Sequence, residues 1–142
     1  MKEFLRPDGS VFLQVERDRV HDWVYARWLG SQTLATVQQG GLYYVELLRQ
    51  EPCPRLLNDH QELIGSFSEA NDWISQVWTP LIREAGLRYF AQVLAPGIFA
   101  QLSIVDLQQR LGGQLELRLF GSLPTAREWL LSTAPAAADR SA

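Results

Sequence analysis

Apolar and polar residues follow one another along this chain with a period that changes from segment to segment. Over residues 73–85 the apolar side chains recur three and four positions apart, which places them on one stripe of a helix. Gly86 follows, and glycine commonly ends a helix because it takes the left-handed backbone conformation without strain. Residues 87–94 are then short, rich in Tyr, Phe, Val and Leu, and closed by Pro96-Gly97, as expected of a largely buried strand. This helix, turn and strand predict an α/β sheet.

The beginning of the chain has the pattern of a hairpin. Residues 11–16 alternate apolar and polar side chains, and residues 20–29 form a second strand-like run after Arg17-Asp18-Arg19. Alternation in the second run puts Trp23, Tyr25 and Arg27 on one face and Val24, Ala26 and Trp28 on the other. Because both faces carry bulky side chains, we expect a strand that is covered on both sides or one that uses a face for association.

Residues 31–50 have helical periodicity, but Gly40 and Gly41 lie in the middle of this segment. A glycine inside a helix costs roughly 0.5–1 kcal/mol relative to alanine, so something should compensate. Close packing of the helix backbone on the sheet is the explanation we favour, and the alternative is a ligand that approaches the backbone.

The middle of the chain predicts a central strand, a loop and a second helix. Residues 54–59 form a short apolar strand, and the loop at 63–70 contains Ser66 and Glu69 at the spacing of a capping box. The second helix should therefore start near 67–69. Pro80 lies inside it and removes a backbone donor, so the helix should be kinked near Thr79 or restart there with Thr79 as its N-cap.

The last third of the chain predicts a helix over 99–111, a strand over 114–120 that alternates like an edge strand, and a closing helix over 124–131. Helices that alternate with strands imply a mostly parallel sheet. We therefore predict an α/β fold: a mixed, mostly parallel sheet of about five strands with an N-terminal antiparallel hairpin and about four helices. One domain should span 1–133, and residues 134–142 should form a disordered tail.

Composition narrows the classes of protein. The chain of 142 residues has 46% hydrophobic and 20% charged residues, with 16 acidic against 13 basic side chains, which is typical of a globular domain. A sequence pI near 5.3 argues against nonspecific nucleic-acid binding, which requires clustered basic residues. We see no secretory signal and no apolar run long enough for membrane insertion, so a cytoplasmic location is expected. The single Cys53 excludes an internal disulfide.

Candidate chemistry is sparse. His21 precedes Asp22 and His60 follows Asp59, but this spacing is not that of known metal sites, so we expect both histidines to be exposed polar residues. Gly65-Ser66 is the nearest candidate for an anion site at a helix start, although a plain N-cap is the interpretation we favour. No nucleophile motif is present. We expect no catalytic residue, no metal and no cofactor.

The chain resembles the STAS and SpoIIAA-like family of small bacterial α/β domains over residues 11–131. The similarity is carried by Leu56-Leu57-Asn58-Asp59, by Gly86-Leu87-Arg88, and by Phe120 followed by Ala126-Arg127-Glu128-Trp129-Leu130. The last segment is similar to the F…A-x-x-WL ending of many SpoIIAA-like proteins.

This resemblance implies a non-enzymatic domain. Relatives act as phosphorylation-switched partners in anti-sigma-factor signalling, as cytoplasmic parts of anion transporters, or as ligand sensors. Phosphorylated members carry a Ser or Thr where the helix after the central strand begins, and here Ser66 and Ser68 lie in that region without the family's Asp-Ser-Ser/Thr-Gly pattern. The predicted binding or switch loop therefore comprises Asp59, Gly65, Ser66 and Ser68.

Two functions follow from this picture. The leading prediction is a protein-interaction or signalling domain whose partner the sequence does not identify, and a fully packed core would favour it. The alternative is a small-molecule or lipid-binding module with a pocket between the sheet and the Trp73 helix, for which an apolar cavity of roughly 300–1,000 Å³ is expected. A hydrolytic enzyme ranks third.

Self-association is a further expectation. On an α-helix Trp73 and Trp78 lie about 140° apart, so they cannot both point at one sheet. Trp23 and Trp28 likewise lie on opposite faces of their strand. We therefore predict a homodimer through the aromatic surface of Trp23 and Trp28 or of Trp73 and Trp78, unless helices cover both faces of the sheet.

Overall fold

The computed structural model describes residues 1–133 and contains one sheet of six strands in the order β1-β2-β3-β4-β5-β6. The strands are β1 (Lys2–Leu5), β2 (Val11–Asp18), β3 (Trp23–Ser31), β4 (Arg55–Ile64), β5 (Tyr89–Val93) and β6 (Glu116–Phe120). The helices are α1 (Leu34–Gln50), η1 (Ser68–Ala70), α2 (Asn71–Trp73), η2 (Ile74–Trp78), α3 (Thr79–Glu84), α4 (Ile98–Leu111) and α5 (Leu123–Ser132). The tail predicted for 134–142 lies outside the described residues.

The sheet is mixed, as predicted. β1, β2 and β3 pair antiparallel, whereas β3, β4, β5 and β6 pair parallel. The predicted α/β class with its N-terminal hairpin is confirmed. The sequence pattern missed β1, whose four residues include one buried side chain, Phe4, and are too short to show a period.

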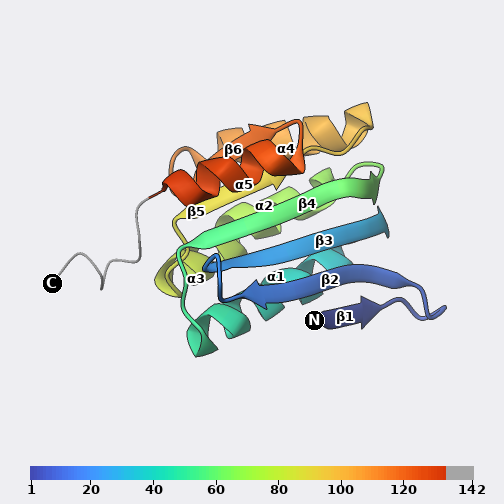
Figure 1. Cartoon of the computed structure of the whole chain (residues 1–142). Helices are drawn as coiled ribbons and strands as arrows, with labels where there is room; N and C mark the ends of the chain where they lie inside the picture. The colour runs from blue at the N-terminus through green and yellow to red at the C-terminus, as the bar shows by residue number, and fades with distance from the viewer. Residues whose placement is uncertain (134–142) are drawn as a thin grey trace, which may run out of the picture.

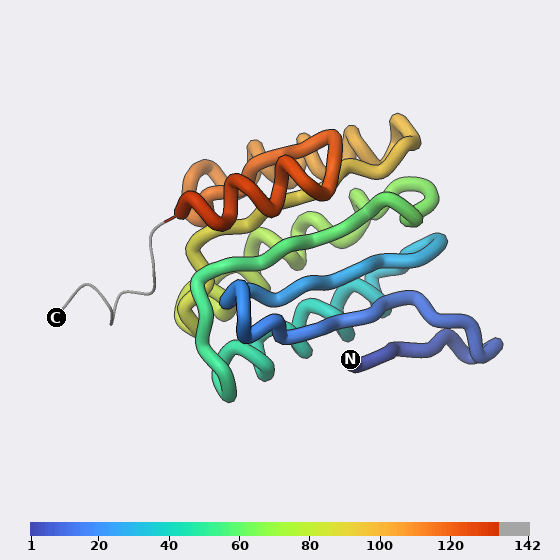
Figure 2. Tube along the Cα trace, viewed as in Figure 1, coloured from blue at the N-terminus to red at the C-terminus, as the bar shows by residue number. Residues whose placement is uncertain are grey.

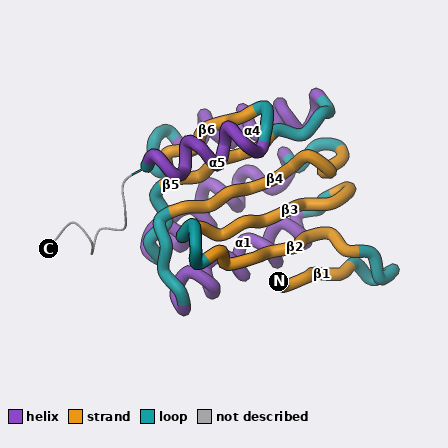
Figure 3. Tube along the Cα trace, in the orientation of Figure 1, coloured by secondary structure: helices purple, strands orange, loops and turns teal. Residues whose placement is uncertain are grey.

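The helices are divided unequally between the two faces of the sheet. Each parallel crossover moves one strand further in the same direction, so its right-handed path carries the helices α1, α2, α3 and α4 to one face (Figures 1 and 2). α5 lies alone on the opposite face, where it packs on β4, β5 and β6 (Figure 3). The open part of that face lies over β1 and β2.

The alternation predicted for the hairpin is confirmed in β3. Val24, Ala26 and Trp28 belong to the large core beneath α1 and α4, and Trp23 with the half-buried Tyr25 belongs to the smaller core beneath α5. Each face of β3 is therefore covered at its bulky positions, and bulk on both faces does not require a partner.

Gly40 and Gly41 are explained by close packing. A methyl group on Gly40 would lie 2.5 Å from Cη2 of Trp28 and 2.6 Å from Cδ2 of Leu13, so the backbone of α1 approaches the sheet as only glycine allows. At Gly41 a methyl group would lie 3.0 Å from Cδ1 of Trp78. The two glycines lower the helix propensity of α1 but let its backbone contact three indole rings, those of Trp28, Trp73 and Trp78.

The helical segment from Ser68 to Glu84 changes its winding instead of ending and restarting. Residues Ile74–Trp78 form a π turn that ends two positions before Pro80, which has no backbone N–H to donate. Thr79 has helical dihedral angles, and its Oγ1 donates to the carbonyl of Ile74 at 2.8 Å. The irregularity expected near Thr79 is therefore a π turn, and the alternative in which the helix restarts with Thr79 as its N-cap is wrong.

Candidate functional site

The predicted switch loop lies between β4 and η1 at the carboxyl end of the parallel strands, the end at which α/β sheets usually bind ligands. Gly65 has φ +79°, a conformation that favours glycine. Ser66 accepts a hydrogen bond from the backbone N–H of Ser68 at 3.1 Å and shares another with the hydroxyl of Ser103 at 3.0 Å. Both loop serines are exposed, so Gly65, Ser66 and Ser68 form one accessible turn held against α4.

The predicted capping box is wrong. Ser66 does not cap a helix with Glu69; the N-cap of η1 is Phe67, which makes no side-chain cap hydrogen bond. Glu69 instead accepts a hydrogen bond from the backbone N–H of Leu34 at 3.1 Å, at the N-terminus of α1. The reason is positional: the loop brings Glu69 to the free donors of a neighbouring helix, where a carboxylate is favourable.

Large apolar side chains surround this loop without cover. Leu34 starts α1, Ile64 ends β4, and three more belong to the first turns of α4, which contacts η1 (Figure 1). Their exposed fractions range from 37% at Leu34 to 67% at Phe99. We call this set the end cluster: Leu34, Ile64, Ile98, Phe99 and Leu102.

Acidic groups border the end cluster. Besides Glu69, Asp72 and Asp106 lie on the adjoining helices α2 and α4, and both pair with Arg110. The amide of Asn71, which donates to Asp106 at 3.0 Å, and then Arg110 hold the pKa of the Asp106 carboxyl below its usual range. These three carboxylates outnumber the two guanidinium groups at this end of the sheet, Arg110, which pairs with two of them, and Arg6, which donates to the carbonyl of Ser31.

Asp59 is not part of the loop. Its side chain lies on the α5 face of β4, where Oδ2 accepts the hydroxyl hydrogen of Tyr25 at 2.7 Å and Oδ1 accepts the N–H of Gln61 at 2.9 Å. Burial first, and then this hydrogen bond, raise the pKa of Tyr25. The prediction that Asp59 joins Gly65, Ser66 and Ser68 in one site is therefore wrong, because alternation along β4 directs Asp59 to the opposite side of the sheet.

The prediction that both histidines are exposed is also wrong. His60 is 5% exposed on β4, and burial lowers its pKa to about 3. His21 is half-buried, stacks on Trp23 with ring centroids 4.6 Å apart, and bonds through Nδ1 to Asp18, not to Asp22. Neither histidine belongs to a group of three or more His, Cys, Asp or Glu side chains that could hold a metal ion within residues 1–133.

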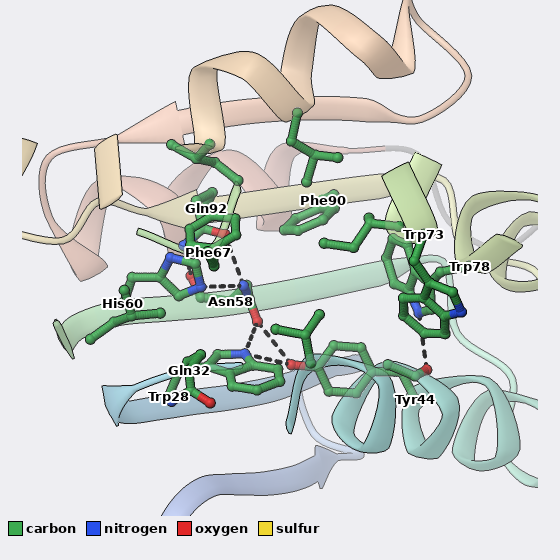
Figure 4. Close-up of a pocket in the computed structure, with 16 residues that line it drawn as sticks. Trp28, Gln32, Tyr44, Asn58, His60, Phe67, Trp73, Trp78, Phe90 and Gln92 are labelled. Carbon is green, nitrogen blue, oxygen red and sulfur yellow. Dashed lines mark hydrogen bonds between the residues drawn. The ribbon is translucent and has the colours of Figure 1, made fainter. Parts of the chain in front are cut away.

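His60 belongs to a buried hydrogen-bonded set that we call the core network: Trp28, Tyr44, Asn58, His60 and Gln92 (Figure 4). Asn58 is its centre. Its Oδ1 accepts from the indole of Trp28 and from the hydroxyl of Tyr44, both at 2.9 Å, and its Nδ2 bonds to Gln92 Oε1 at 2.8 Å and to His60 Nε2 at 3.1 Å. Asn58 therefore uses every donor and acceptor that it has.

The core network lies along a small cavity between the sheet and the covering helices. The cavity is about 60 Å³ in volume, with walls that include Phe67, Trp73, Trp78 and Phe90. This is room for about two water molecules and far below the volume of an ordinary ligand pocket. The core is thus close to fully packed in the structure as it stands.

The predicted aromatic interface is wrong for three of its four members. Trp23, Trp28 and Trp78 are each at most 5% exposed within a single chain, so they offer no surface to a second copy. Trp73 is half-buried. The expected angle of 140° between Trp73 and Trp78 fails because the π turn intervenes: residues five apart are joined by a backbone hydrogen bond, and both indoles pack on Gly41.

Sequence reasoning missed the core network although a signal was present. Asn58 and His60 are two positions apart in a strand, so they share a face, and that face also carries the apolar Leu56. A pair of polar residues on the apolar face of a central strand points to a buried hydrogen-bonded set. The partner Gln92 lies opposite Asn58 in β5, a register that only the fold supplies.

Comparison with known proteins supports the fold alone. No protein-family model matches the chain, and no curated protein matches it in sequence. Among solved structures, it is similar to an uncharacterised protein of the DUF3478 family with a SpoIIAA-like fold from Shewanella loihica PV-4, with a TM-score of 0.54 and 19% sequence identity. The match covers 83% of this chain and 91% of that chain. The chain therefore has a SpoIIAA-like fold.

Proposed function

We propose that this SpoIIAA-like chain is a non-enzymatic interaction domain that binds a protein partner through the end cluster and the loop at 65–67. The observation that carries the proposal is the end cluster itself. Large exposed apolar side chains that gather in one patch usually mark an interaction site, whereas single ones scattered over a surface do not. Within residues 1–133, neither histidine hydrogen-bonds to a Ser, Thr or Cys side chain, so no such nucleophile is paired with a histidine base.

The charges around the end cluster indicate which kind of partner it would bind. Glu69, Asp72 and Asp106 border it, so a twofold dimer through this surface would bring like charges together. The same charges disfavour a bilayer with anionic lipids. No helix among the described residues has the length and apolarity to span a membrane. The partner that fits is a protein segment with apolar side chains flanked by Lys or Arg.

The test compares two substitutions of equal chemistry at opposite ends of the sheet. Phe99→Glu places a charge in the end cluster, and Val20→Glu places one at the 91% exposed turn between β2 and β3. Cross-linking in extract of the source cells should capture a partner with the wild type and with Val20→Glu, and lose it with Phe99→Glu. Equal capture by all three proteins would exclude the end cluster as the docking surface.

Two further measurements separate this proposal from other occupants. Light scattering should give a monomeric mass near 16.1 kDa for the wild type. If the wild type is a dimer and Phe99→Glu dissociates it, the end cluster binds a second copy of this chain and not a different protein. Sedimentation with phosphatidylcholine vesicles containing one-quarter phosphatidylglycerol should show no binding of the wild type. If the wild type binds the vesicles and Phe99→Glu does not, the end cluster binds a membrane surface and not a protein.

We further propose that phosphorylation of the loop would regulate docking. A phosphate on Ser66 would break its hydrogen bonds to Ser68 and Ser103 and place negative charge beside Glu69. Ser66→Asp should therefore weaken partner capture more than Ser68→Asp does, because within residues 1–133 the Ser68 hydroxyl hydrogen-bonds to Ser66 and not to α4. If neither substitution changes capture, the loop is not a phosphorylation switch.

A further inference from the structure

The core network fixes the position of one proton. An indole N–H only donates, so the group that faces Trp28 Nε1 must be the carbonyl oxygen of Asn58. The amide nitrogen of Asn58 then faces Nε2 of His60, at 3.1 Å. Because that nitrogen donates, Nε2 must accept, and the ring hydrogen of a neutral His60 resides on Nδ1.

This Nδ1–H group is the donor that the network leaves unused. Both Asn58 Nδ2 hydrogens are taken, and Gln92 Nε2 donates to the carbonyls of Asn58 and Val93. No hydrogen bond within residues 1–133 uses Nδ1 of His60. The imidazole is neutral at pH 7, since burial lowers its pKa to about 3. His60 is one of the residues that line the cavity, and its neutral ring carries this donor.

The walls of the cavity exclude charge. Its lining contains aromatic, aliphatic and amide side chains and no Asp, Glu, Lys or Arg among the described residues. A charged molecule would lose its hydration there without an ionic partner, at a large cost. An uncharged, flat molecule would keep its contacts with the ring faces.

Among the tryptophan and tyrosine rings that line the cavity, Trp73 is held differently from the others. Trp28, Tyr44 and Trp78 are each tied by a hydrogen bond from the polar atom of the ring, in the last case to the carbonyl of Gly41 at 2.9 Å. Trp73 is half-buried, and its indole nitrogen has no hydrogen-bond partner within 1–133. Figure 4 shows His60 at one end of the pocket and Trp73 at the other. Outward movement of Trp73 would enlarge the cavity at the least cost.

We propose that this cavity is a binding site for a small, flat, uncharged molecule that offers a hydrogen-bond acceptor to Nδ1–H of His60 and displaces the indole ring of Trp73. This binding site is independent of the docking surface that we propose at the end cluster. The hydrogen bond to His60 would orient the molecule in the cavity. Displacement of the Trp73 indole would provide the volume that the closed cavity lacks.

Three probes of similar size test the proposal by calorimetric titration at pH 7. Acetophenone has an acceptor, ethylbenzene has none, and benzoate is charged. Acetophenone should bind about tenfold more tightly than ethylbenzene, the effect of one hydrogen bond of ordinary strength, and benzoate should not bind. Equal affinity for acetophenone and ethylbenzene, or no binding of acetophenone up to its solubility limit, would overturn the proposal.

Variants assign the effect to the two residues. His60→Phe should remove the preference for acetophenone and leave ethylbenzene within about twofold of its wild-type affinity. Trp73→Ala should increase the affinity for acetophenone, whereas the matched Trp129→Ala on the other face of the sheet should leave it unchanged. Equal effects of the two tryptophan substitutions would exclude Trp73 as the displaced wall.

A measurement on the wild type is independent of whether His60→Phe folds. The ¹⁵N chemical shifts of the imidazole distinguish the two tautomers, and they should show hydrogen on Nδ1 of His60. Acetophenone should shift that signal together with the indole N–H signal of Trp73. Hydrogen on Nε2, or a shift at neither residue, would refute the assignment.

Discussion

Polar side chains usually lie at the surface and large apolar ones in the core, but the core network buries polar groups and the end cluster exposes apolar ones. Asn58 is polar and 6% exposed at the centre of the sheet, whereas Phe99 is apolar and 67% exposed at its end. The chain compensates for the first exception within itself, because all four hydrogen-bonding positions of the Asn58 amide are occupied. Nothing among the described residues covers Phe99 to compensate for the second.

This difference separates stability from function. A buried polar group that is fully bonded belongs to the fold, and its loss should be measured as unfolding free energy. An exposed apolar group contributes little to the unfolding free energy of the chain on its own, and it should affect binding when a partner covers it. The following predictions test this division, from the largest expected effect to the smallest.

Asn58→Leu should lower the free energy of unfolding by about 3 kcal/mol, because it leaves several buried partners, among them Trp28 and His60, without their hydrogen bonds. Urea denaturation followed by circular dichroism measures the loss. Gln109→Leu makes a similar exchange at an exposed position of α4 and should stay within about 0.5 kcal/mol of the wild type. Equal losses for the two variants would mean that the core network does not stabilise the fold.

Acid should destabilise the protein through His60. Its pKa in the folded state, about 3, lies below the value of 6.5 for a free histidine, so only the unfolded chain takes up this proton as the pH falls through 6.5. Stability is therefore complete above pH 6.5 and decreases toward pH 3, by about 2 kcal/mol between pH 6.5 and pH 5. Urea denaturation at the two pH values measures this slope, and His60→Phe should flatten it. An unchanged slope in the variant would assign the pH dependence to other groups.

Gly40→Ala should cost about 1–2 kcal/mol, since the clash of its methyl group with Trp28 and Leu13 exceeds the gain in helix propensity. Gly41→Ala should cost less, because its methyl group would lie 3.0 Å from the nearest indole atom instead of 2.5 Å. Thermal unfolding of the two variants ranks them. A stabilised Gly40→Ala protein would contradict the close packing of α1 on the sheet.

Phe99→Glu should change the free energy of unfolding by no more than about 0.5 kcal/mol, because the side chain buries little area in the free chain. Chemical denaturation measures this value, and the cross-linking assay measures docking on the same sample. A loss of several kcal/mol would show that Phe99 belongs to the core, and the contrast with Asn58 would then disappear.

Local periodicity was sufficient to predict most of the fold. The helices before and after β4 and the two faces of β3 follow from spacings of three, four and two residues, which depend on neighbours in the chain. The π turn was not predictable in the same way. Its five residues continue the apolar pattern of an α-helix, and the angle between Trp73 and Trp78 changes only when the backbone hydrogen bonds shift.

The candidate sites were less accessible to sequence reasoning. Gly65, Ser66 and Ser68 could be assigned to one loop before a helix because a turn and a helix start are local features. The core network joins Asn58 to Trp28, Tyr44 and Gln92, all of which are distant in sequence. The assignment of Ser66 as a cap failed for a similar reason, since Glu69 reaches a helix that begins at Leu34. Partners across the sheet require the register of the strands.

The order of the strands bears on how the chain folds. Every described strand from β2 to β6 pairs with the strand that precedes it in the sequence, so none of them must wait for a later strand to fill a gap beside it. The hairpin of β2 and β3 closes over residues 19–22, and each later strand can add to the growing edge together with the helix before it. Contacts between successive elements fold faster than pairings between distant ones. During synthesis the sheet can therefore grow from the N-terminus strand by strand, with β6 exposed until α5 follows it.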